Sequence, residues 1–402
     1  MAADSDTPIY LDNHATTRVD PRVVEAMLPW LTEDYGNAGS AGHAFGGRAS
    51  AAVDQARATL AGAINCRPEE IVFTSGATES NNLAIRGVAT RRRRPGDHLV
   101  SVATEHTAVL DPIRRLERAG YRATLLAVEP HGAEHAGRVD PGAVAEALRP
   151  DTCLASVMLA NNEIGAVQPL AEIAGVCHAA GVPLHTDATQ AVGKLPVDVQ
   201  ALGVDLLSLT GHKLHGPKGV GALYVRSRDP VVRLEPQITG GGQEFGRRGG
   251  TLNVPGIVGL ARAIELCQDE LSTEPGRQGR LRNRLASQLA DRAAPLELCG
   301  PGLNAVDTAG APTRLPGNLM VALGDTDGEA VRLRTPGVAL STGAACSSAE
   351  PEPSHVLLAL GLTADTARTA LRMGLSRFTT EVDVDSAADQ LCGAIRTLRG
   401  LA

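Results

Sequence analysis

The 402-residue chain has few of the features that would place it in a specialised class of protein. Aromatic residues make up only 2% of it, so its core has to be built mainly from Ala, Val and Leu. No run approaches the roughly 18 apolar residues that a membrane helix needs. The N-terminal stretch MAADSDTPIY carries two aspartates where a signal peptide has its apolar segment. A net charge of -7 provides no general positive field for nucleic acid.

The seven cysteines include no C-x-x-C pair, so neither a disulfide framework nor a zinc site is expected, and a reducing, cytoplasmic location fits best. Six of them lie in strand-like or helix-like runs and are predicted to be inert: Cys66, Cys153, Cys177, Cys267, Cys299 and Cys392. The seventh, Cys346, lies in STGAACSSAEPEP (341–353), a loop-like stretch with almost no large apolar neighbours. With Gly343 for backbone freedom, such a loop would expose a reactive thiol.

Between about residues 50 and 260, short apolar runs alternate with amphipathic stretches. The runs predicted to be strands are EIVFTSG, DHLVSVAT, RATLLAV, TCLASVMLA, GVPLHTDA, VDLLSLT and GVGALYV. Several of the helical stretches between them end at Gly or Pro. This alternation indicates βαβ units and a largely parallel sheet. Beyond residue 262, a long polar helix with an expected break at Pro275–Gly276 precedes short strands, loops and a final helix.

We therefore expect an α/β fold in two domains. Residues 18–262 would form a large domain, with a mainly parallel sheet covered by helices. Residues 1–17 and 263–402 would form a smaller α+β domain that carries the Cys346 loop.

Polar residues follow the predicted strands at their carboxyl ends, where open parallel sheets bind ligands. His106, Asn161, Asp187 and Lys213 each follow a different strand. One such residue is usually a cap or a local hydrogen-bonding group, but four are hard to attribute to chance. They suit pyridoxal phosphate (PLP), because a lysine can form a Schiff base with it, a carboxylate can keep its pyridine nitrogen protonated and an aromatic ring can stack on its face.

This chemistry assigns a role to each residue. Lys213 would form the Schiff base, Asp187 would hold the ring nitrogen and His106 would stack on the ring. Lys218 is the rival lysine, but its Pro-Lys-Gly setting indicates a turn beyond the site. Asn161 and Gln190 would contact the ring hydroxyl. The phosphate contacts are expected from Ala77, Thr78, Thr210 and His212, although an ordinary helix cap also explains the stretch TSGATE (74–79).

The chain resembles the cysteine desulfurases, in the class V aminotransferase family of fold-type I PLP enzymes. Similar motifs run along its whole length: YLDNHATT (10–17), GNAGSAGHAFG (36–46), FTSGATESNNLAIRG (73–87), ATEHTAVL (103–110), NNEIGAVQPL (161–170), HTDATQAVGK (185–194), TGHKLHGPKGVGALYV (210–225), GGGQEFGRRGGTLNVPGIVG (240–259), STGAACSSAEPEPSHVLLALGL (341–362) and LRMGLSRFTT (371–380). The departures are His14, Ala38–Gly39, His215 and the loop sequence GAACSSAE. None removes a catalytic group, and the roles of His14 and His215 stay open.

The resemblance implies conversion of L-cysteine to L-alanine. Lys213 and His106 would move protons, while Arg372, with its bidentate fork, and Asn37 would hold the substrate carboxylate. The Cys346 thiolate would take the sulfur as a persulfide and pass it to an acceptor protein, in iron–sulfur cluster assembly or a thiolation pathway. No resident metal is expected, although Cys346 could transiently ligate an iron–sulfur cluster.

The resemblance also implies a homodimer with shared sites. The stretch GGGQEFGRRGGTLN (240–253) resembles the segment that crosses to the partner's cofactor, where Thr251 would contact the phosphate. Two alternatives stay open: a selenocysteine lyase or related C–S lyase on the same scaffold, and a non-catalytic partner in sulfur or iron–sulfur assembly. The presence of Lys213, Asp187, His106 and Cys346 argues against the second.

Overall fold

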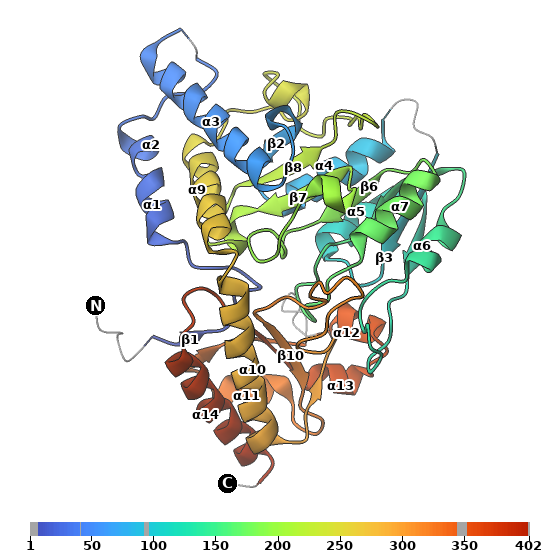
Figure 1. The fold of residues 1–402 in the computed structure, drawn as a ribbon, viewed down its shortest axis with the longest axis vertical. Coiled ribbons are helices and arrows are strands. Elements are labelled where there is room, and N and C mark those ends of the chain that lie inside the picture. Colours follow the sequence, from blue (N-terminus) through green and yellow to red (C-terminus); the bar gives the residue numbers. More distant parts are fainter. Residues whose placement is uncertain (1–6, 41, 92–95, 344–351, 401–402) are drawn as a thin grey trace.

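The computed structural model describes residues 7–40, 42–91, 96–343 and 352–400. A seven-stranded sheet with helices around it forms the upper part of the molecule in Figure 1, and a four-stranded sheet with its own helices forms the lower part. A parallel two-stranded pair, β1 (Ile9–Tyr10) and β11 (Val338–Ala339), joins the N-terminal segment to the lower part. In the described ranges, no helix is long and apolar enough to cross a bilayer.

The large sheet has the order β2-β8-β7-β6-β5-β3-β4. In that order its strands are Ile71–Thr74, Gly221–Val225, Leu206–Thr210, Leu184–Asp187, Thr152–Ser156, His98–Val102 and Arg122–Leu126. All seven predicted runs contain a strand, and the largely parallel sheet is confirmed. Only β8 is reversed, since it runs antiparallel to both β2 and β7. The chain between β7 and β8 is short, and antiparallel neighbours need no crossover helix.

The helices of the large part are α1 (Pro21–Met27), α2 (Pro29–Thr32), α3 (Ala44–Ala63), α4 (Ala77–Ala89), α5 (Thr107–Arg118), α6 (Pro141–Ala147), α7 (Leu170–Ala179), α8 (Val199–Leu202) and α9 (Val254–Glu270), with single turns at Pro68–Glu70, Gly211–Lys213 and Glu244–Gly246. They cover the sheet, so that all residues of β7 and β8 are buried. This double coverage explains why these strands are continuous apolar runs rather than alternating ones.

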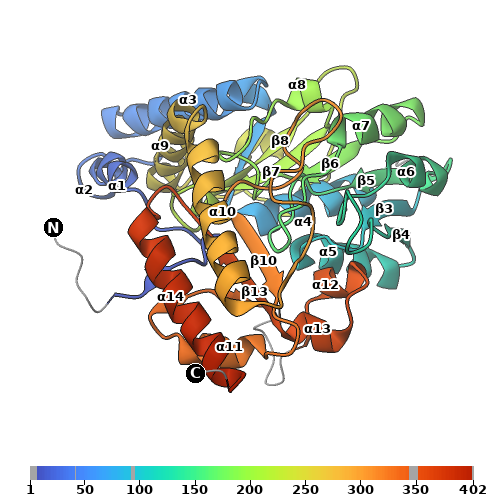
Figure 2. The same ribbon diagram turned by 60° about the horizontal axis from the view of Figure 1, so that its bottom comes forward.

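The small sheet has the order β12-β13-β10-β9 and is antiparallel throughout. Its strands are Ser341–Thr342, Ala370–Gly374, Asn318–Ala322 and Glu297–Leu298, and its helices are α10 (Glu274–Ala293), α11 (Gly328–Arg334), α12 (His355–Ala359), α13 (Ala364–Arg368) and α14 (Glu381–Leu398). Helices α10 and α14 lie side by side in Figure 2 and share an apolar core with the sheet. Central strand β13 carries Arg372.

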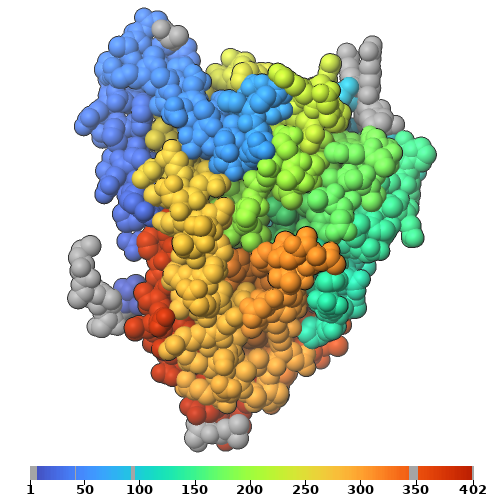
Figure 3. Space-filling view, viewed as in Figure 1, coloured from blue at the N-terminus to red at the C-terminus, as the bar shows by residue number. Residues whose placement is uncertain are grey.

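The long helix expected beyond residue 262 is two helices, as predicted, but the break comes slightly earlier than Pro275. Helix α9 ends at Glu270 and α10 begins at Glu274, which puts Pro275 in the first turn of α10. Proline is tolerated there because the first-turn N–H groups have no partner within the helix. In Figure 3 the orange segment of the small part lies against the green of the large part, where Ala166 and Arg314 form an isolated bridge.

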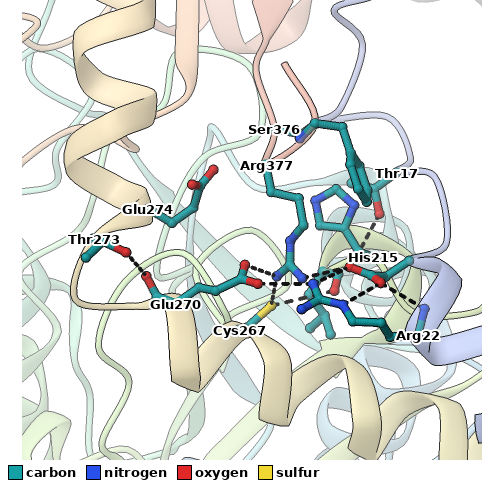
Figure 4. A network of polar contacts seen from close by, with 12 residues as sticks. Thr17, Arg22, His215, Cys267, Glu270, Thr273, Glu274, Ser376 and Arg377 are labelled. Carbon is teal, nitrogen blue, oxygen red and sulfur yellow. Dashed lines mark hydrogen bonds and ion pairs between the residues drawn. The ribbon is translucent and has the colours of Figure 1, made fainter. Parts of the chain in front are cut away.

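A buried polar network ties the segment after β13 to the large part (Figure 4). The Arg377 guanidinium lies 3.1 Å from an Asp20 oxygen and 3.3 Å from a Glu270 oxygen, and its Nη2 also donates to Cys267 Sγ at 3.1 Å. Arg22 pairs with the same two carboxylates. Because Arg377 follows Arg372 closely in the chain, the network helps to fix where β13 lies relative to the large sheet.

Candidate active site

A cavity of about 610 Å³ lies at the carboxyl ends of the strands of the large sheet, and Arg372 reaches it from the small part. It is therefore at the edge where the sequence analysis expected a ligand. The predicted residues that line it are Ala77, Thr78, His106, Asp187, Gln190, Thr210, His212, Lys213 and Arg372. They come from segments far apart in the sequence, and the sheet topology brings their strand ends together.

Lys213 ends the helical turn that follows β7. Its Nζ donates to the carbonyl oxygens of His14, at 2.5 Å, and Ala15, at 2.7 Å. Burial and the nearby Arg372 cation lower the pKa of Lys213 to about 8, because burial disfavours any charge and Arg372 disfavours a second positive one. Roughly a tenth of this amine is therefore neutral, and hence nucleophilic, at pH 7, far more than of an ordinary lysine. The rival Lys218 lines the same cavity but is exposed.

Asp187, the last residue of β6, is the buried carboxylate of the cavity. Its two oxygens accept hydrogen bonds from Asn81 Nδ2, at 2.7 Å, and from the backbone N–H of Thr189, at 2.9 Å. These donors fix the orientation of the carboxyl group without cancelling its charge. A fixed carboxylate can hold a protonated pyridine nitrogen.

His106 follows β3 and caps the N-terminus of α5. Its Nδ1 accepts from the backbone N–H of Ala108 at 3.0 Å, so the proton of the neutral ring is on Nε2. Burial lowers the pKa of His106, which favours this neutral ring. The local fold thus sets both the tautomer and the direction of the ring, which is exposed to the cavity.

The N-terminus of α4 borders the cavity, and Gly76, Ala77 and Thr78 line it there. Its cap residue is Gly76, with φ of 149°, and no side chain caps the first turn. A side chain is disfavoured at this φ, and a Cβ at Gly221 would come within 2.7 Å of the Gly76 backbone. Free N–H groups at a helix start attract a phosphate. Thr78 and Thr210 add hydroxyl groups to this end.

Arg372 is nearly buried and holds its guanidinium with three contacts. Nη2 donates to Asp12 Oδ1 at 2.9 Å and to Ser341 Oγ at 2.8 Å, and Nη1 donates to the carbonyl oxygen of Asn162 at 3.3 Å. Within the described ranges, its buried Nε has no partner. The second hydrogen of Nη1 therefore remains to bind an anion, such as a carboxylate, whereas Nε is buried on the other edge of the guanidinium.

One predicted contact needs correction. The Asn161 side chain faces its own turn, where Oδ1 accepts from the N–H groups of Glu163 and Ile164 and Nδ2 donates to the carbonyl oxygen of Thr104. Asn162, the next residue, lines the cavity instead. Two adjacent asparagines at a strand end cannot be told apart by pattern, because the turn geometry decides which one faces the ligand.

Two other predicted residues lie away from this cavity. Asn37 is exposed and borders a separate hollow near Phe245, and its Oδ1 accepts from the Gly39 N–H at 2.8 Å. Thr251 is exposed and does not line the cavity of its own chain. The predicted nucleophile, Cys346, lies outside the described residues. Its role and that of Thr251 therefore stay predictions.

His14 is a cavity residue to which the sequence analysis assigned no role. It is 2% exposed, its Nδ1 lies 3.1 Å from Gln190 Oε1, and its Nε2 has no partner within the described ranges. It comes from an N-terminal loop, so neither strand ends nor periodicity mark it.

His215, the other departure, serves the local structure. Its backbone N–H donates to Thr17 Oγ1 at 2.9 Å (Figure 4). Its ring Nδ1 lies 3.0 Å from the carbonyl oxygen of Arg18, and the ring packs edge-on against Phe378. Its φ of 64° is left-handed. His215 does not line the cavity.

The other cysteines are poor nucleophiles. Five of the six that the structure describes are buried, and Cys66 is half-buried. Burial raises the pKa of Cys66, Cys177 and Cys299 to about 12, and it also raises that of Cys267 and Cys392. These thiols stay protonated near neutral pH, in line with the expectation that they are inert.

The cavity fits PLP by several independent features. It has an uncapped helix N-terminus for a phosphate, a buried carboxylate for a ring nitrogen and an amine whose pKa of about 8 suits covalent attachment. Buried polar atoms of His14 and Arg372, which have no partner within the described ranges, lie in its wall. Such atoms are costly unless a ligand pairs with them.

Comparisons with known proteins agree with this site. The family model "Aminotransferase class-V" matches residues 9–386. The "Cysteine desulfurase IscS" of Anaeromyxobacter dehalogenans (strain 2CP-C) is 50% identical over 392 residues, which is 98% of this chain and 93% of the relative. The "Cysteine desulfurase" of Mus musculus is 45% identical over 392 residues, covering 98% and 82% respectively.

Solved structures are similar over the same length. One described as "NIFS-LIKE PROTEIN" has a TM-score of 0.87 and 34% identity and covers 98% of this chain and 100% of its own. Another, "SspA in complex with cysteine", has a TM-score of 0.78 and 36% identity and covers 92% and 99%. The cofactor of the family, PLP, is the one that the cavity fits, and the chain belongs to the cysteine desulfurases of the class V aminotransferase family.

Proposed function

We propose that this enzyme converts L-cysteine to L-alanine and transfers the sulfur to Cys346 as a persulfide. The observation that carries the proposal is the pairing of Lys213, an amine with a pKa of about 8, with the partly unpaired guanidinium of Arg372 in one cavity. The first suits attachment of PLP and the second suits the carboxylate of an amino acid. Bound PLP supplies the electron sink that stabilises negative charge at the substrate α-carbon.

Each residue then has one task. Lys213 would hold the cofactor covalently, and its amine would take the α-proton of the substrate. Asp187 would keep the ring nitrogen of the cofactor protonated, and His106, with its proton on Nε2, would stack on the ring and assist proton transfer. Gln190 contacts the ring oxygen. The phosphate contacts come from the start of α4 (Ala77 and Thr78), Thr210 and His212.

Sulfur transfer requires a thiolate at Cys346. The thiolate attacks the γ-sulfur of the substrate and forms an S–S bond while the Cβ–S bond breaks. The three-carbon fragment takes up one proton at Cβ, regains one at the α-carbon and leaves as alanine, so no external oxidant or reductant is needed. The persulfide is then passed to an acceptor protein of iron–sulfur assembly or thiolation, which fits a reducing, cytoplasmic location.

The test follows one turnover by mass spectrometry. With L-cysteine, we expect one added sulfur on Cys346 and an equivalent amount of alanine. The variant C346S should form no persulfide at this position and should produce alanine much more slowly. C177S, at a buried thiol, is the matched control and should behave as wild type. A persulfide on another cysteine would contradict the proposal. A strong preference for L-selenocysteine would favour selenocysteine lyase, the alternative on the same scaffold.

We also propose a homodimer in which Thr251 contacts the phosphate of the partner's cofactor. The glycine-rich stretch 240–253 supports this, because Phe245 is 62% exposed while Glu244 anchors the stretch to its own chain through Arg57, at 2.6 Å. Mixing the inactive variant K213A with T251A is the test. In a mixed dimer one site would have both residues intact, so activity should return. Absence of any recovery in a demonstrated mixed dimer would contradict a shared site.

A further inference from the structure

In the cavity wall, Gln190 is held by a largely buried chain of polar side chains. Gln190 Oε1 lies 2.9 Å from Lys194 Nζ and 3.1 Å from His14 Nδ1, and Gln190 Nε2 donates to the carbonyl oxygen of His14 at 2.9 Å. All of this takes place next to Lys213, whose Nζ donates to the same carbonyl oxygen. Two side chains and one backbone carbonyl group therefore meet at the amide of Gln190.

These contacts determine which way the amide of Gln190 points. The carbonyl oxygen of His14 can only accept, so the atom facing it has to be the amide nitrogen. The Lys194 ammonium can only donate, so the atom facing it has to be the amide oxygen. If the amide were flipped, its oxygen would face the carbonyl oxygen of His14 and its nitrogen would face the Lys194 ammonium, so neither contact would be a hydrogen bond. Only one of the two N–H groups of Nε2 is thereby used, and the other remains for a ligand in the cavity.

The same logic assigns the tautomer of His14. Because Gln190 Oε1 is an acceptor, Nδ1 of His14 carries the hydrogen and Nε2 does not. Burial lowers the pKa of His14 well below its usual value, and the nearby cations of Lys194, Arg372 and Lys213 act in the same direction. The ring is therefore neutral. Gly374 leaves no room beside it, since a Cβ there would lie 2.7 Å from His14 Cδ2.

Lys194 has no direct task in the mechanism proposed above. Burial lowers its pKa to about 7, with a further contribution from the Lys213 cation. In the described part of the chain, its recorded hydrogen bond is the one to Gln190 Oε1. A buried amine costs free energy unless it is paired, so a place directly behind a cofactor-binding amide calls for a functional explanation.

We propose that Lys194 and His14 are positioning residues that fix the amide of Gln190 as a hydrogen-bond donor toward the ring oxygen of PLP. The proposal rests on the Gln190 contact proposed above. A donor at that oxygen stabilises its negative charge and so weakens the hold of the oxygen on the proton of the Lys213–cofactor linkage. The pKa of the linkage is therefore lowered, and the cofactor is bound more tightly.

The test is a titration of the visible absorbance of the holoenzyme against pH, together with the affinity of the apoprotein for PLP. Q190A removes the donor and should raise the pKa of the linkage by about one unit, the equivalent of one charge-assisted hydrogen bond. K194M and H14L should each raise it in the same direction. H14N is the matched control, because its amide N–H can take the place of Nδ1–H and should restore the wild-type pKa. The affinity of the apoprotein for PLP should fall in Q190A, K194M and H14L and should be restored in H14N.

A double variant separates positioning from a direct effect of charge. If Lys194 acts through Gln190, K194M should add no shift to Q190A, since neighbours that act as one unit are not additive. A full additional shift would mean that the Lys194 charge acts directly, which overturns the positioning role. The positioning role would also be overturned if Q190A raised the pKa of the linkage but K194M and H14L did not. No shift in Q190A would instead refute the proposed Gln190 contact. Thermal melts of each variant check folding. Q190E is a second variant for the loss of the donor, because its carboxylate keeps the acceptor contacts with Lys194 and His14 but cannot donate to the cofactor.

Discussion

Arg372 offers the sharpest prediction for substrate recognition, because the structure shows how many of its donors are free. Of the five N–H groups of a guanidinium, Asp12 and Ser341 take the two on Nη2 and the carbonyl oxygen of Asn162 takes one on Nη1. The second N–H of Nη1 remains for a carboxylate, since the buried Nε lies on the other edge of the guanidinium. A hydrogen bond to a charged group contributes about 2 kcal/mol.

R372K keeps the charge but loses the fixed planar geometry, so it should weaken binding of L-cysteine by up to about tenfold. R372M should lose the hydrogen bond altogether, or about 30-fold. Folding should change little, since the Asp12 partner is partly exposed, at 21%, and such pairs contribute at most about 1 kcal/mol.

The assay measures dissociation constants from the visible absorbance in a C346S background, which prevents sulfur transfer. Cysteamine, which lacks the carboxylate, is the matched ligand. Both Arg372 variants should weaken binding of L-cysteine and leave that of cysteamine nearly unchanged. Equal weakening of both ligands would refute a carboxylate contact and would point to a general disturbance of the cavity.

Three further predictions concern other residues. K213A should lose the visible absorbance of attached PLP, and peptide mapping after borohydride reduction should find no cofactor on another lysine; a label on Lys218 would contradict the assignment. In the apoprotein, only the neutral form of the Lys213 amine reacts, so its rate of acylation should rise with pH, with a midpoint of about 8, and level off above it. A midpoint near the 10.5 of an ordinary lysine would contradict the effect of burial and of Arg372. R57M should destabilise the fold by about 3–5 kcal/mol, because it leaves the buried Glu244 carboxylate without its partner. Urea unfolding measures this loss, and a change under about 1 kcal/mol would show that Glu244 finds another partner.

Much of the fold follows from local pattern. Six of the seven strands of the large sheet are buried along their whole length, and a strand covered on both faces is a continuous apolar run that the sequence pattern detects. The seventh, edge strand β4, is partly exposed. The reversal of β8 was not predicted, since burial looks the same in both directions. What decides it is the short connection after β7, and that connection carries Lys213.

The sequence by itself determined the chemistry of the site, because Lys213, Asp187 and His106 stand at strand ends, and the carboxyl ends of parallel strands meet at one edge. The tertiary structure decided which neighbours complete the site. It placed Asn162 rather than Asn161 in the cavity, left Asn37 at a separate hollow and brought His14 from the N-terminal loop to Gln190 and Lys194. These choices depend on turn geometry and on contacts between residues far apart in the chain, and periodicity along the sequence records neither.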